Sequence, residues 1–359
     1  MKKNRIVVGL SGGVDSSVAA KFLVDQGHEV IGVFMKNWEE DGPECTAPRD
    51  VLDAEKVAKK LKIPFYNVNF SKIYFQEVFE YFLSETRAGR TPNPDILCNK
   101  FVKFGVFWEK AKELGAEFIA TGHYAKKNWN EHAKKWELYI PEDKEKDQTY
   151  FLHALNQMQL SCVIFPLENL KKKEVRRIAK EAGFQTAEKK DSTGICFIGE
   201  RNYSQFLQKF LKKSPGNIIH EETGKVVGKH IGTNFYTLGQ RRELGVGGVK
   251  GMREAPWFII RKERKTNELF ISQDEKKLLA TKLVATNLNW IAGEPPSKKF
   301  NCGARIRYRS EIVSCEVTLK KEEAFVNFLT PVRAITPGQS VVFYDGKVCL
   351  GGGEIQGKI

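Results

Sequence analysis

The segment at residues 6–17 is Ile6-Val7-Val8-Gly9-Leu10-Ser11-Gly12-Gly13-Val14-Asp15-Ser16-Ser17, a short apolar run that passes directly into a turn rich in glycine and serine. The run predicts a buried β-strand, and the residues after the turn predict a helix over 16–26. Glycines let the backbone turn its N–H groups toward an anion, and the first turn of a helix adds partial positive charge. The segment therefore predicts a strand–loop–helix unit that binds phosphate groups. The alternative is a glycine–serine turn that only links strand to helix.

The loop differs from the commonest phosphate-binding loop. It lacks the lysine of the GxxxxGK[ST] pattern. Its serines can donate further hydrogen bonds to an anion, but Asp15 would repel phosphate unless a cation such as Mg²⁺ lay between them. We therefore expect a phosphate site of another type, used together with Mg²⁺.

Apolar strands alternate with helical segments through the first part of the chain. We expect strands over residues 6–10, 28–34, 65–70 and 117–121, and helices over 16–26, 50–61, 98–114 and 171–183. Asp50 is expected to cap its helix, and Gly183 to end the last one. This alternation predicts a doubly wound α/β fold with a parallel sheet, whose ligands lie at the carboxyl ends of the strands.

The remainder of the chain has a different character. A polar stretch over 126–146 predicts an exposed hairpin, and frequent glycines after about Tyr203 predict a small β-rich module. From about Lys282, short alternating strands separated by turns at 336–338 and 345–346 predict a compact antiparallel β-barrel. We expect three domains, at 1–202, 203–281 and 282–359.

The composition indicates a polyanionic partner. The chain has 359 residues, a net charge of +14 and a pI near 9.3. Its basic residues cluster at Lys171, Lys172, Lys173, Arg176 and Arg177, at Arg241 and Arg242, at 261–265, and at Arg305, Arg307 and Arg309. Clustering of this kind favours nucleic acid as the partner, whereas a generally basic soluble protein is the alternative.

The cysteines and the hydropathy indicate a cytoplasmic protein. Seven cysteines are scattered without a CxxC pair or the spacing of a secreted disulfide scaffold. No apolar run approaches the roughly 20 residues that cross a bilayer, and no signal-peptide cleavage site follows the first apolar run. We expect a reducing cytoplasm and no membrane association.

Two of the cysteines stand in unusual surroundings. Cys98 follows the proline-rich loop 91–97 at a predicted helix start beside Lys100 and Lys103, an environment that favours the thiolate. Asp95 could act there as a general acid or base, or hold an incoming base. Cys196 lies between flexible glycines in 191–199, where a loop could carry a thiol. We expect Cys162, Cys302, Cys315 and Cys349 to be small buried hydrophobic residues.

Several long motifs occur in a fixed order along the chain. They are SGGVDSS (11–17), FMKNWEE (34–40), TPNPDILCNKF (91–101), ATGHYA (120–125), KDQTYFL (146–152), DSTGICFIGERNYSQFL (191–207), TLGQRRELGVGG (237–248), ARIRYRSE (304–311) and TPGQSVVFYDG (336–346). With them the chain closely resembles, over nearly its whole length, the bacterial tRNA-specific 2-thiouridylases (MnmA/TrmU), which are PP-loop ATP pyrophosphatases.

The resemblance implies an activity and a set of site residues. It implies conversion of the wobble uridine in tRNAs for Lys, Glu and Gln to 2-thiouridine, with ATP cleaved to AMP and pyrophosphate. ATP would be bound by Gly9, Leu10, Ser11, Gly12, Gly13, Val14, Asp15, Ser16, Met35 and Gly122. Cys98 would be the nucleophile, Cys196 would carry a persulfide, and Asp95 would assist. Contacts to tRNA would come from Asn93, Pro94, Asp95, His123, Lys146, Asp147, Gln148, Arg307, Tyr308 and Gln339.

The implied chemistry requires Cys98 and Cys196 to come close together. Adenylation turns uracil O2 into a leaving group, after which sulfur from Cys196 either attacks C2 directly or is first released by Cys98. Both routes end in a Cys98–Cys196 disulfide, so the two Cα atoms must come within about 4.4–6.8 Å in at least one state. Along 303–309, Arg305, Arg307 and Arg309 are expected to project from one strand face toward RNA phosphates, unless that face is simply solvated.

Two other classes of protein compete with this interpretation. ATP-dependent ligases and amidotransferases share the phosphate loop but need no cysteine pair, and a non-catalytic tRNA-binding protein would not cleave ATP. Met35 and His123 could also be ordinary core or strand-end residues. We expect a monomer that receives sulfur from a donor protein. The sequence leaves open the donor, the tRNA set, the oligomeric state, and whether Cys98, Cys196 and Asp95 ever hold a metal or cluster.

Overall fold

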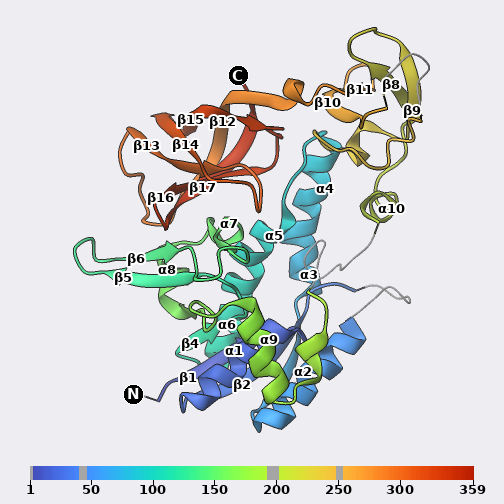
Figure 1. The fold of residues 1–359 in the computed structure, drawn as a ribbon. Helices are drawn as coiled ribbons and strands as arrows, with labels where there is room; N and C mark the ends of the chain where they lie inside the picture. The colour runs from blue at the N-terminus through green and yellow to red at the C-terminus, as the bar shows by residue number, and fades with distance from the viewer. Residues whose placement is uncertain (1–2, 40–46, 192–201, 248–253) are drawn as a thin grey trace.

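The computed structural model describes residues 3–39, 47–191, 202–247 and 254–359, whose strands form three sheets (Figure 1). The first sheet is parallel throughout, with the strand order β3-β2-β1-β4-β7. Its strands are β1 (Arg5–Gly9), β2 (Glu29–Lys36), β3 (Phe65–Asn69), β4 (Phe118–Ala120) and β7 (Val163–Ile164). Ile6 and Val8 belong to one apolar cluster and Val7 to another, because successive strand side chains point to opposite faces. The predicted α/β sheet, covered on both faces, is confirmed.

Helices occupy the connections between these strands and the segment that follows β7. They are α1 (Val14–Asp25), α2 (Ala47–Leu61), α3 (Ser71–Tyr74), the π-helix η1 (Phe75–Phe79), α4 (Glu80–Arg87), α5 (Pro94–Leu97), the π-helix η2 (Cys98–Val106), α6 (Phe107–Glu113), α7 (Thr149–Leu152), α8 (Gln157–Cys162), α9 (Lys172–Glu181) and the 3₁₀-helix η3 (Gln185–Glu188). Gly183 follows α9 with a φ of +62°, as predicted for a helix end. Asp50 is not a cap, since α2 begins three residues earlier and the Asp50 carboxylate pairs with Lys189.

The second sheet is small and follows the α/β region in the chain. It contains β8 (Gly216–His220), β9 (Val226–His230), β10 (Phe258–Glu263) and β11 (Glu268–Ser272) in the order β10-β11-β8-β9, and helices α10 (Tyr203–Leu207), η4 (Thr233–Phe235) and η5 (Glu275–Leu278) flank it. Its core includes Ile218, Ile259 and Leu269. Phe206 of α10 packs against Trp38 and Phe79 of the α/β region, with ring centroids 6.0 and 5.8 Å apart. The sequence correctly predicted a β-rich module here.

The third sheet closes into a barrel. Its strands are β12 (Leu279–Trp290), β13 (Lys299–Arg305), β14 (Val313–Lys320), β15 (Glu323–Arg333), β16 (Ser340–Asp345) and β17 (Val348–Lys358). They pair antiparallel in the order β12-β15-β14-β13-β16-β17, and β12 pairs with β17 to complete the ring. The predicted turns are present, with positive φ at Gly338 (+90°) and Gly346 (+55°). The predicted barrel is confirmed.

One strand of the barrel region was predicted wrongly. The sequence placed a strand over 303–309, but β13 ends at Arg305 and the following residues form a turn in which Arg309 has a φ of +64°. The three arginines therefore do not share one strand face. Arg305 instead points to Asp147, and Arg307 donates to the carbonyl of Leu238.

The hairpin predicted in 126–146 extends the barrel sheet rather than standing free. It consists of β5 (Lys126–Asn130) and β6 (Lys135–Tyr139), and β6 pairs antiparallel with β17 through Leu138 and Tyr139 (Figure 1). Backbone hydrogen bonds thus join the α/β region to the barrel. Among the described residues, no helix has both the length and the apolar character to cross a membrane.

A buried ion pair reinforces this junction. Arg305 Nη1 lies 2.9 Å from Asp147 Oδ2, with 12% of the Arg305 side chain and 2% of the Asp147 side chain exposed. The other carboxylate oxygen of Asp147 accepts hydrogen bonds from the backbone N–H and the hydroxyl of Thr149, at 2.9 and 2.6 Å. Breaking such a pair leaves one charge buried without its partner, which costs far more than losing an exposed pair.

We therefore expect Arg305→Met to lower the free energy of unfolding by about 3–5 kcal/mol. The double variant Arg305→Met/Asp147→Asn should lose less than this single variant, because neither buried group then carries a charge. Urea unfolding of the wild type, both single variants and the double variant measures the coupling.

The control is the exposed pair Lys135–Glu294, which also links the β5–β6 hairpin to the barrel region at 2.7 Å. Glu294→Gln should leave the urea midpoint unchanged. An Arg305→Met midpoint equal to that of the wild type would show that the buried pair does not hold the junction.

Candidate active site

The phosphate loop connects β1 to α1 at the carboxyl end of the parallel sheet. Gly12 has a φ of +71°, and a Cβ atom there would lie 2.2 Å from the carbonyl oxygen of Asp50, so only glycine fits. Gly122, which follows β4, comes so close that its Cβ would lie 2.7 Å from the backbone nitrogen of Ser16. Ser16 Oγ donates to the carbonyl of Gly13 at 3.1 Å and accepts from the N–H of Ser11 at 3.1 Å. The loop is thus tightly folded and in contact with Gly122.

Met35 lies on the other side of the loop, near the end of β2. Its side chain is buried, and its Cε atom lies 3.0 Å from the position that a Cβ on Gly9 would take. Because β2, β1 and β4 are neighbours in the sheet, Met35, the loop at 9–16 and Gly122 lie side by side at one edge. The structure therefore brings together the residues expected to bind the nucleotide.

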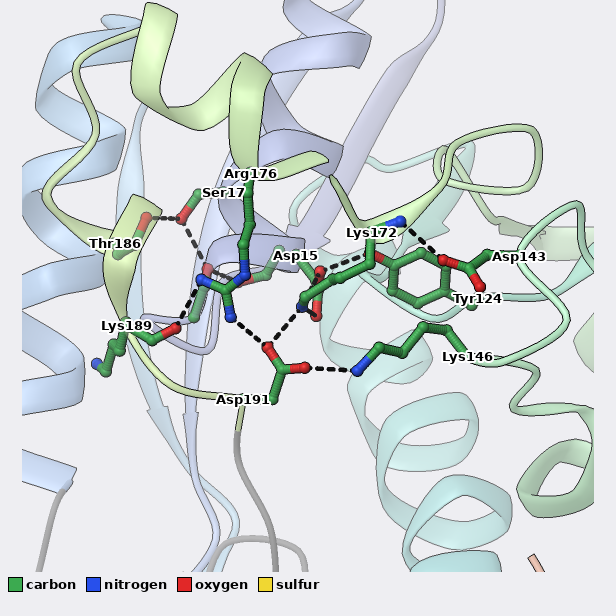
Figure 2. A network of polar contacts seen from close by, with 12 residues as sticks. Asp15, Ser17, Tyr124, Asp143, Lys146, Lys172, Arg176, Thr186, Lys189 and Asp191 are labelled. Carbon is green, nitrogen blue, oxygen red and sulfur yellow. Dashed lines mark hydrogen bonds and ion pairs between the residues drawn. The ribbon is translucent and has the colours of Figure 1, made fainter. Parts of the chain in front are cut away.

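A cation reaches the loop from a distant segment (Figure 2). Lys172, at the start of α9, donates to both carboxylate oxygens of Asp15 at 2.7 Å each. The hydroxyl of Tyr124 donates to the same carboxylate at 2.8 Å. Lys172 Nζ also lies 2.8 Å from Asp191, and only 12% of the lysine side chain is exposed. The loop lacks a lysine of its own, and Lys172 places one beside it.

Asp191 is the centre of a second group of cations (Figure 2). It accepts from Lys146 at 2.6 Å and from Arg176 at 2.7 Å, in addition to its contact with Lys172. Although burial opposes ionisation, hydrogen bonds from Lys146 and Lys172 lower the pKa of Asp191 to about 2. Three cations surround one carboxylate, so this edge of the sheet can attract further negative charge.

Lys189 joins the phosphate loop to α2. Its Nζ donates to the carbonyl of Gly12 at 2.8 Å, to Asp50 at 2.6 Å and to Asp53 at 2.7 Å. Burial opposes the charged form, but the hydrogen bonds to Asp50 and Asp53 raise the pKa of Lys189 above its usual value. The lysine therefore stays charged and ties α2 to the loop backbone.

Cys98 lies in the apolar interior, with none of its surface exposed. It is the first residue of η2, and the preceding helix α5 begins at Pro94 with the Asn93 side chain accepting from the N–H of Asp95 at 3.1 Å. The sequence predicts Cys98 at the start of a helix, but the residue lies in the second turn. The partial positive charge at the helix terminus therefore stabilises its thiolate less. A π-helical segment is a common mark of functional sites.

Cys196 lies outside the described residues, as does Cys45. The expected convergence of Cys98 and Cys196 therefore stays a prediction. Among the described residues, no group of three or more His, Cys, Asp and Glu side chains is placed to hold a metal ion.

Two of the residues expected to contact tRNA, Lys146 and Asp147, line a pocket of about 430 Å³. The other lining residues are Lys144, Glu145, Arg305 and Arg309. Four of these six side chains are cationic, and Lys146 also contacts Asp191 beside the phosphate loop. The pocket therefore adjoins the nucleotide edge of the sheet.

The other expected tRNA contacts are engaged within the protein. Gln148 accepts from the N–H of Tyr124 at 2.8 Å, and Gln339 donates to the carbonyl of Thr91 at 2.6 Å. The ring of Tyr308 lies 4.4 Å from that of Phe151. His123 is buried and bonded to Thr121, and burial together with Lys103 keeps the pKa of His123 well below its usual value. Any contact of these side chains with RNA would replace or add to these bonds.

Sequence reasoning missed the cations around the phosphate loop. The sequence shows Lys172 and Arg176 only as members of a basic cluster. It predicts no role for Lys189 or for Asp191, the first residue of the motif 191–207. The missing lysine in the loop was the one signal available, since it implied that a cation must come from another segment.

Three family models together match most of the chain. A family model described as the tRNA methyl transferase HUP domain matches residues 4–200. The models of the tRNA methyl transferase PRC-barrel domain and the aminomethyltransferase beta-barrel domain match residues 204–273 and 280–355. Among solved structures, the U34-tRNA thiolase NcsA from Methanococcus maripaludis matches with a TM-score of 0.36 and 18% identity, over 55% of this chain and 62% of that one.

Curated relatives are far more similar. The tRNA-specific 2-thiouridylase MnmA of Enterococcus faecalis is 50% identical over 98% of this chain and 95% of its own length. The enzyme of the same name from Francisella tularensis subsp. novicida is 51% identical over 99% of this chain and 100% of its own. Similarity of this extent shows that the chain belongs to the family of tRNA-specific 2-thiouridylases.

Proposed function

We propose that this protein uses ATP to activate the wobble uridine of tRNAs for Lys, Glu and Gln and replaces its O2 with sulfur. The observation that carries the proposal is the glycine loop at the carboxyl end of β1, where Lys172 pairs with Asp15. Lys146 and Arg176 pair with the nearby Asp191, and Lys146 also lines a cationic pocket. The names of the relatives, which match end to end, support the same reaction and substrate.

The residues present fit the phosphates of ATP. The close approach of Gly122 to Ser16 leaves the loop no room for a side chain on that glycine, and the N–H groups at the start of α1 face the carboxyl end of the sheet, where anions bind. In adenylation the uracil oxygen forms a bond to the α-phosphorus while the α–β bond breaks and pyrophosphate leaves. Lys172, Lys146 and Arg176 would balance the charge that gathers on the departing phosphates.

Mg²⁺ is part of the proposal, with Asp15 as its ligand from the protein. Magnesium commonly uses one or two carboxylates together with substrate phosphates. The Asp15 carboxylate is held by Lys172 and Tyr124, so Lys172 would have to move from Asp15 toward the phosphates when the metal binds. Bound there, the ion would withdraw electron density from the phosphate oxygens.

Cys98 supplies the thiol chemistry. The outer sulfur of a persulfide on Cys196 would form a bond to C2, and the C2–O bond would break with its electron pair leaving on AMP. The Cys98 thiolate would then attack the Sγ atom of Cys196. The persulfide S–S bond would break with its electron pair on the sulfur now bound to C2, and Cys98 and Cys196 would end as a disulfide. An external dithiol then reduces that disulfide before the next turnover. Asp95, one turn before Cys98, would hold the base or move a proton, and Asn93 and Pro94 would line its entry.

Partners follow from the same chemistry. The cationic pocket and the turn at 306–312 would contact the tRNA, while a sulfur-donor protein would load Cys196. We propose that the protein acts as a cytoplasmic monomer, since a reducing environment is needed to regenerate both thiols.

Cys98→Ser should lower the rate of 2-thiouridine formation by about a thousandfold or more, because a hydroxyl replaces the only thiol proposed to complete the transfer. Nucleoside mass spectrometry of tRNA incubated with ATP, Mg²⁺ and a persulfide source measures the product. Cys162→Ala is the control, since Cys162 is buried and its thiol donates to the carbonyl of Gln159. Undiminished 2-thiouridine with Cys98→Ser would show that Cys98 does not complete the transfer.

Lys172→Met should weaken ATP binding about ten- to a hundredfold, because a hydrogen bond to a charged group contributes roughly 1.5–3 kcal/mol. Asp191→Asn should strengthen ATP binding several-fold, since it removes an anion that competes for the same three cations. Calorimetric titration with an ATP analogue that resists α–β cleavage tests both.

Lys21→Met is the matched control, because Lys21 pairs with Asp25 at the other end of α1. If Asp191→Asn weakened ATP binding while the thermal midpoint stayed unchanged, Asp191 would be a positioning residue and not a competitor of the phosphates.

Lys144→Ala and Arg309→Ala should each make tRNA binding less dependent on salt. For each cation that contacts a phosphate, the slope of log K against log salt concentration should fall by about 1. Both side chains are exposed at the pocket. Lys110→Ala, on the surface of α6 beside Glu113, is the control and should leave the slope unchanged. Equal slopes for all four proteins would place the RNA elsewhere.

A further inference from the structure

Two cysteines outside the proposed reaction face each other in the barrel. Cys302 of β13 and Cys315 of β14 are direct partners in the antiparallel register, and their sulfur atoms lie 3.7 Å apart. Ala304 and Val317, two residues further along the same strands, are buried in the barrel core. Because alternate residues share a face, both thiols point toward the barrel interior.

This placement meets the geometric needs of a disulfide without any movement of the backbone. Directly opposed residues in an antiparallel pair have Cα atoms about 4.5 or 5.5 Å apart, depending on the type of pair. Both values lie within the range of about 4.4–6.8 Å found for disulfides. Rotation of the two side chains is enough to bring sulfurs in contact to bonding distance.

The two thiols differ in exposure, which sets the order of reaction. Cys302 is partly exposed, whereas only 2% of Cys315 is exposed. The contact with Cys315, together with burial, raises the pKa of Cys302. A raised pKa lowers the thiolate fraction and therefore slows attack by this thiol.

We propose that Cys302 and Cys315 form a reversible dithiol–disulfide site, oxidised by a low-molecular-weight disulfide such as oxidised glutathione. Cys302 attacks the glutathione disulfide and releases one glutathione. Cys315 then displaces the second glutathione from Cys302. Two S–H bonds are replaced by one S–S bond, the protein loses two electrons and two protons, and one glutathione disulfide becomes two glutathione molecules.

The bond would close the segment 303–314 into a covalent loop. This segment contains Arg307, which donates to Leu238 of the central region and to Thr336 of the barrel at 2.9 and 2.7 Å. It also contains Tyr308, whose ring contacts Phe151 of the α/β region. The disulfide would therefore restrain a turn that touches all three regions, independently of whether the turn binds RNA.

The test uses the full-length wild-type protein, equilibrated in glutathione buffers of increasing oxidised fraction and then alkylated in acid. Trypsin separates the two cysteines into the peptides Phe300–Arg305 and Ser310–Lys320. We expect these peptides to become linked, with the linked fraction following the ratio of oxidised glutathione to the square of reduced glutathione. Amide hydrogen exchange at 306–312 should slow in the linked protein.

Controls lie in the same chain. Cys162 and Cys349 are buried, and each contacts a carbonyl oxygen rather than a thiol. Both should therefore be recovered as alkylated thiols at every ratio of oxidised to reduced glutathione. In Cys315→Ala, Cys302 should accumulate as a mixed disulfide with glutathione. Unlinked peptides in the wild type at excess oxidised glutathione would overturn the site, and unchanged exchange at 306–312 in the linked protein would overturn the restraint on the turn.

Discussion

The ion pair between Lys172 and Asp15 is the interaction on which the site depends. The phosphate loop contains a carboxylate and no cation, so at its own position it repels phosphates. Lys172, 157 positions further along the chain, supplies the charge by bonding Asp15 and Asp191 together. Docking of α9 against α1 therefore offsets the charge of Asp15 beside the loop. Phosphate binding in this protein is a property of the folded α/β region and not of its signature sequence.

Contacts between the α/β region and the barrel connect the phosphate loop to the barrel. The β6–β17 pairing and the buried Asp147–Arg305 pair fix the barrel to the segment that carries Lys146. Lys146 in turn contacts Asp191 beside the loop. One continuous path of bonds thus runs from the phosphate loop to the cationic pocket. A ligand that occupies both the phosphate loop and the cationic pocket would contact residues that these bonds join.

The sequence predicted most of the elements but few of the contacts that join them. Apolar runs such as 6–10 and turns such as 345–346 are local signals, and they gave the sheet, the barrel and the loop. The partners of Asp15 and Asp191 lie in distant segments, and β6 pairs with β17 across more than two hundred positions, so no local pattern could reveal them. The strand predicted over 303–309 is wrong at 306–309 for the same reason, because Arg307 is held by Leu238 and Thr336 and not by a sheet.

Because Cys98 is buried, the steps of the proposed reaction would follow a fixed order. A thiol with no exposed surface is protected from solvent oxidants and cannot attack a base that remains stacked in RNA. Apolar side chains around it must separate before a base enters, and unstacking the base costs a few kcal/mol as well. Contacts between the cationic pocket and tRNA would offset both costs. The pocket is joined to the nucleotide edge through Lys146, so binding of RNA and exposure of the thiol would be favoured where ATP is already in place. Sulfur transfer would then be confined to an activated base.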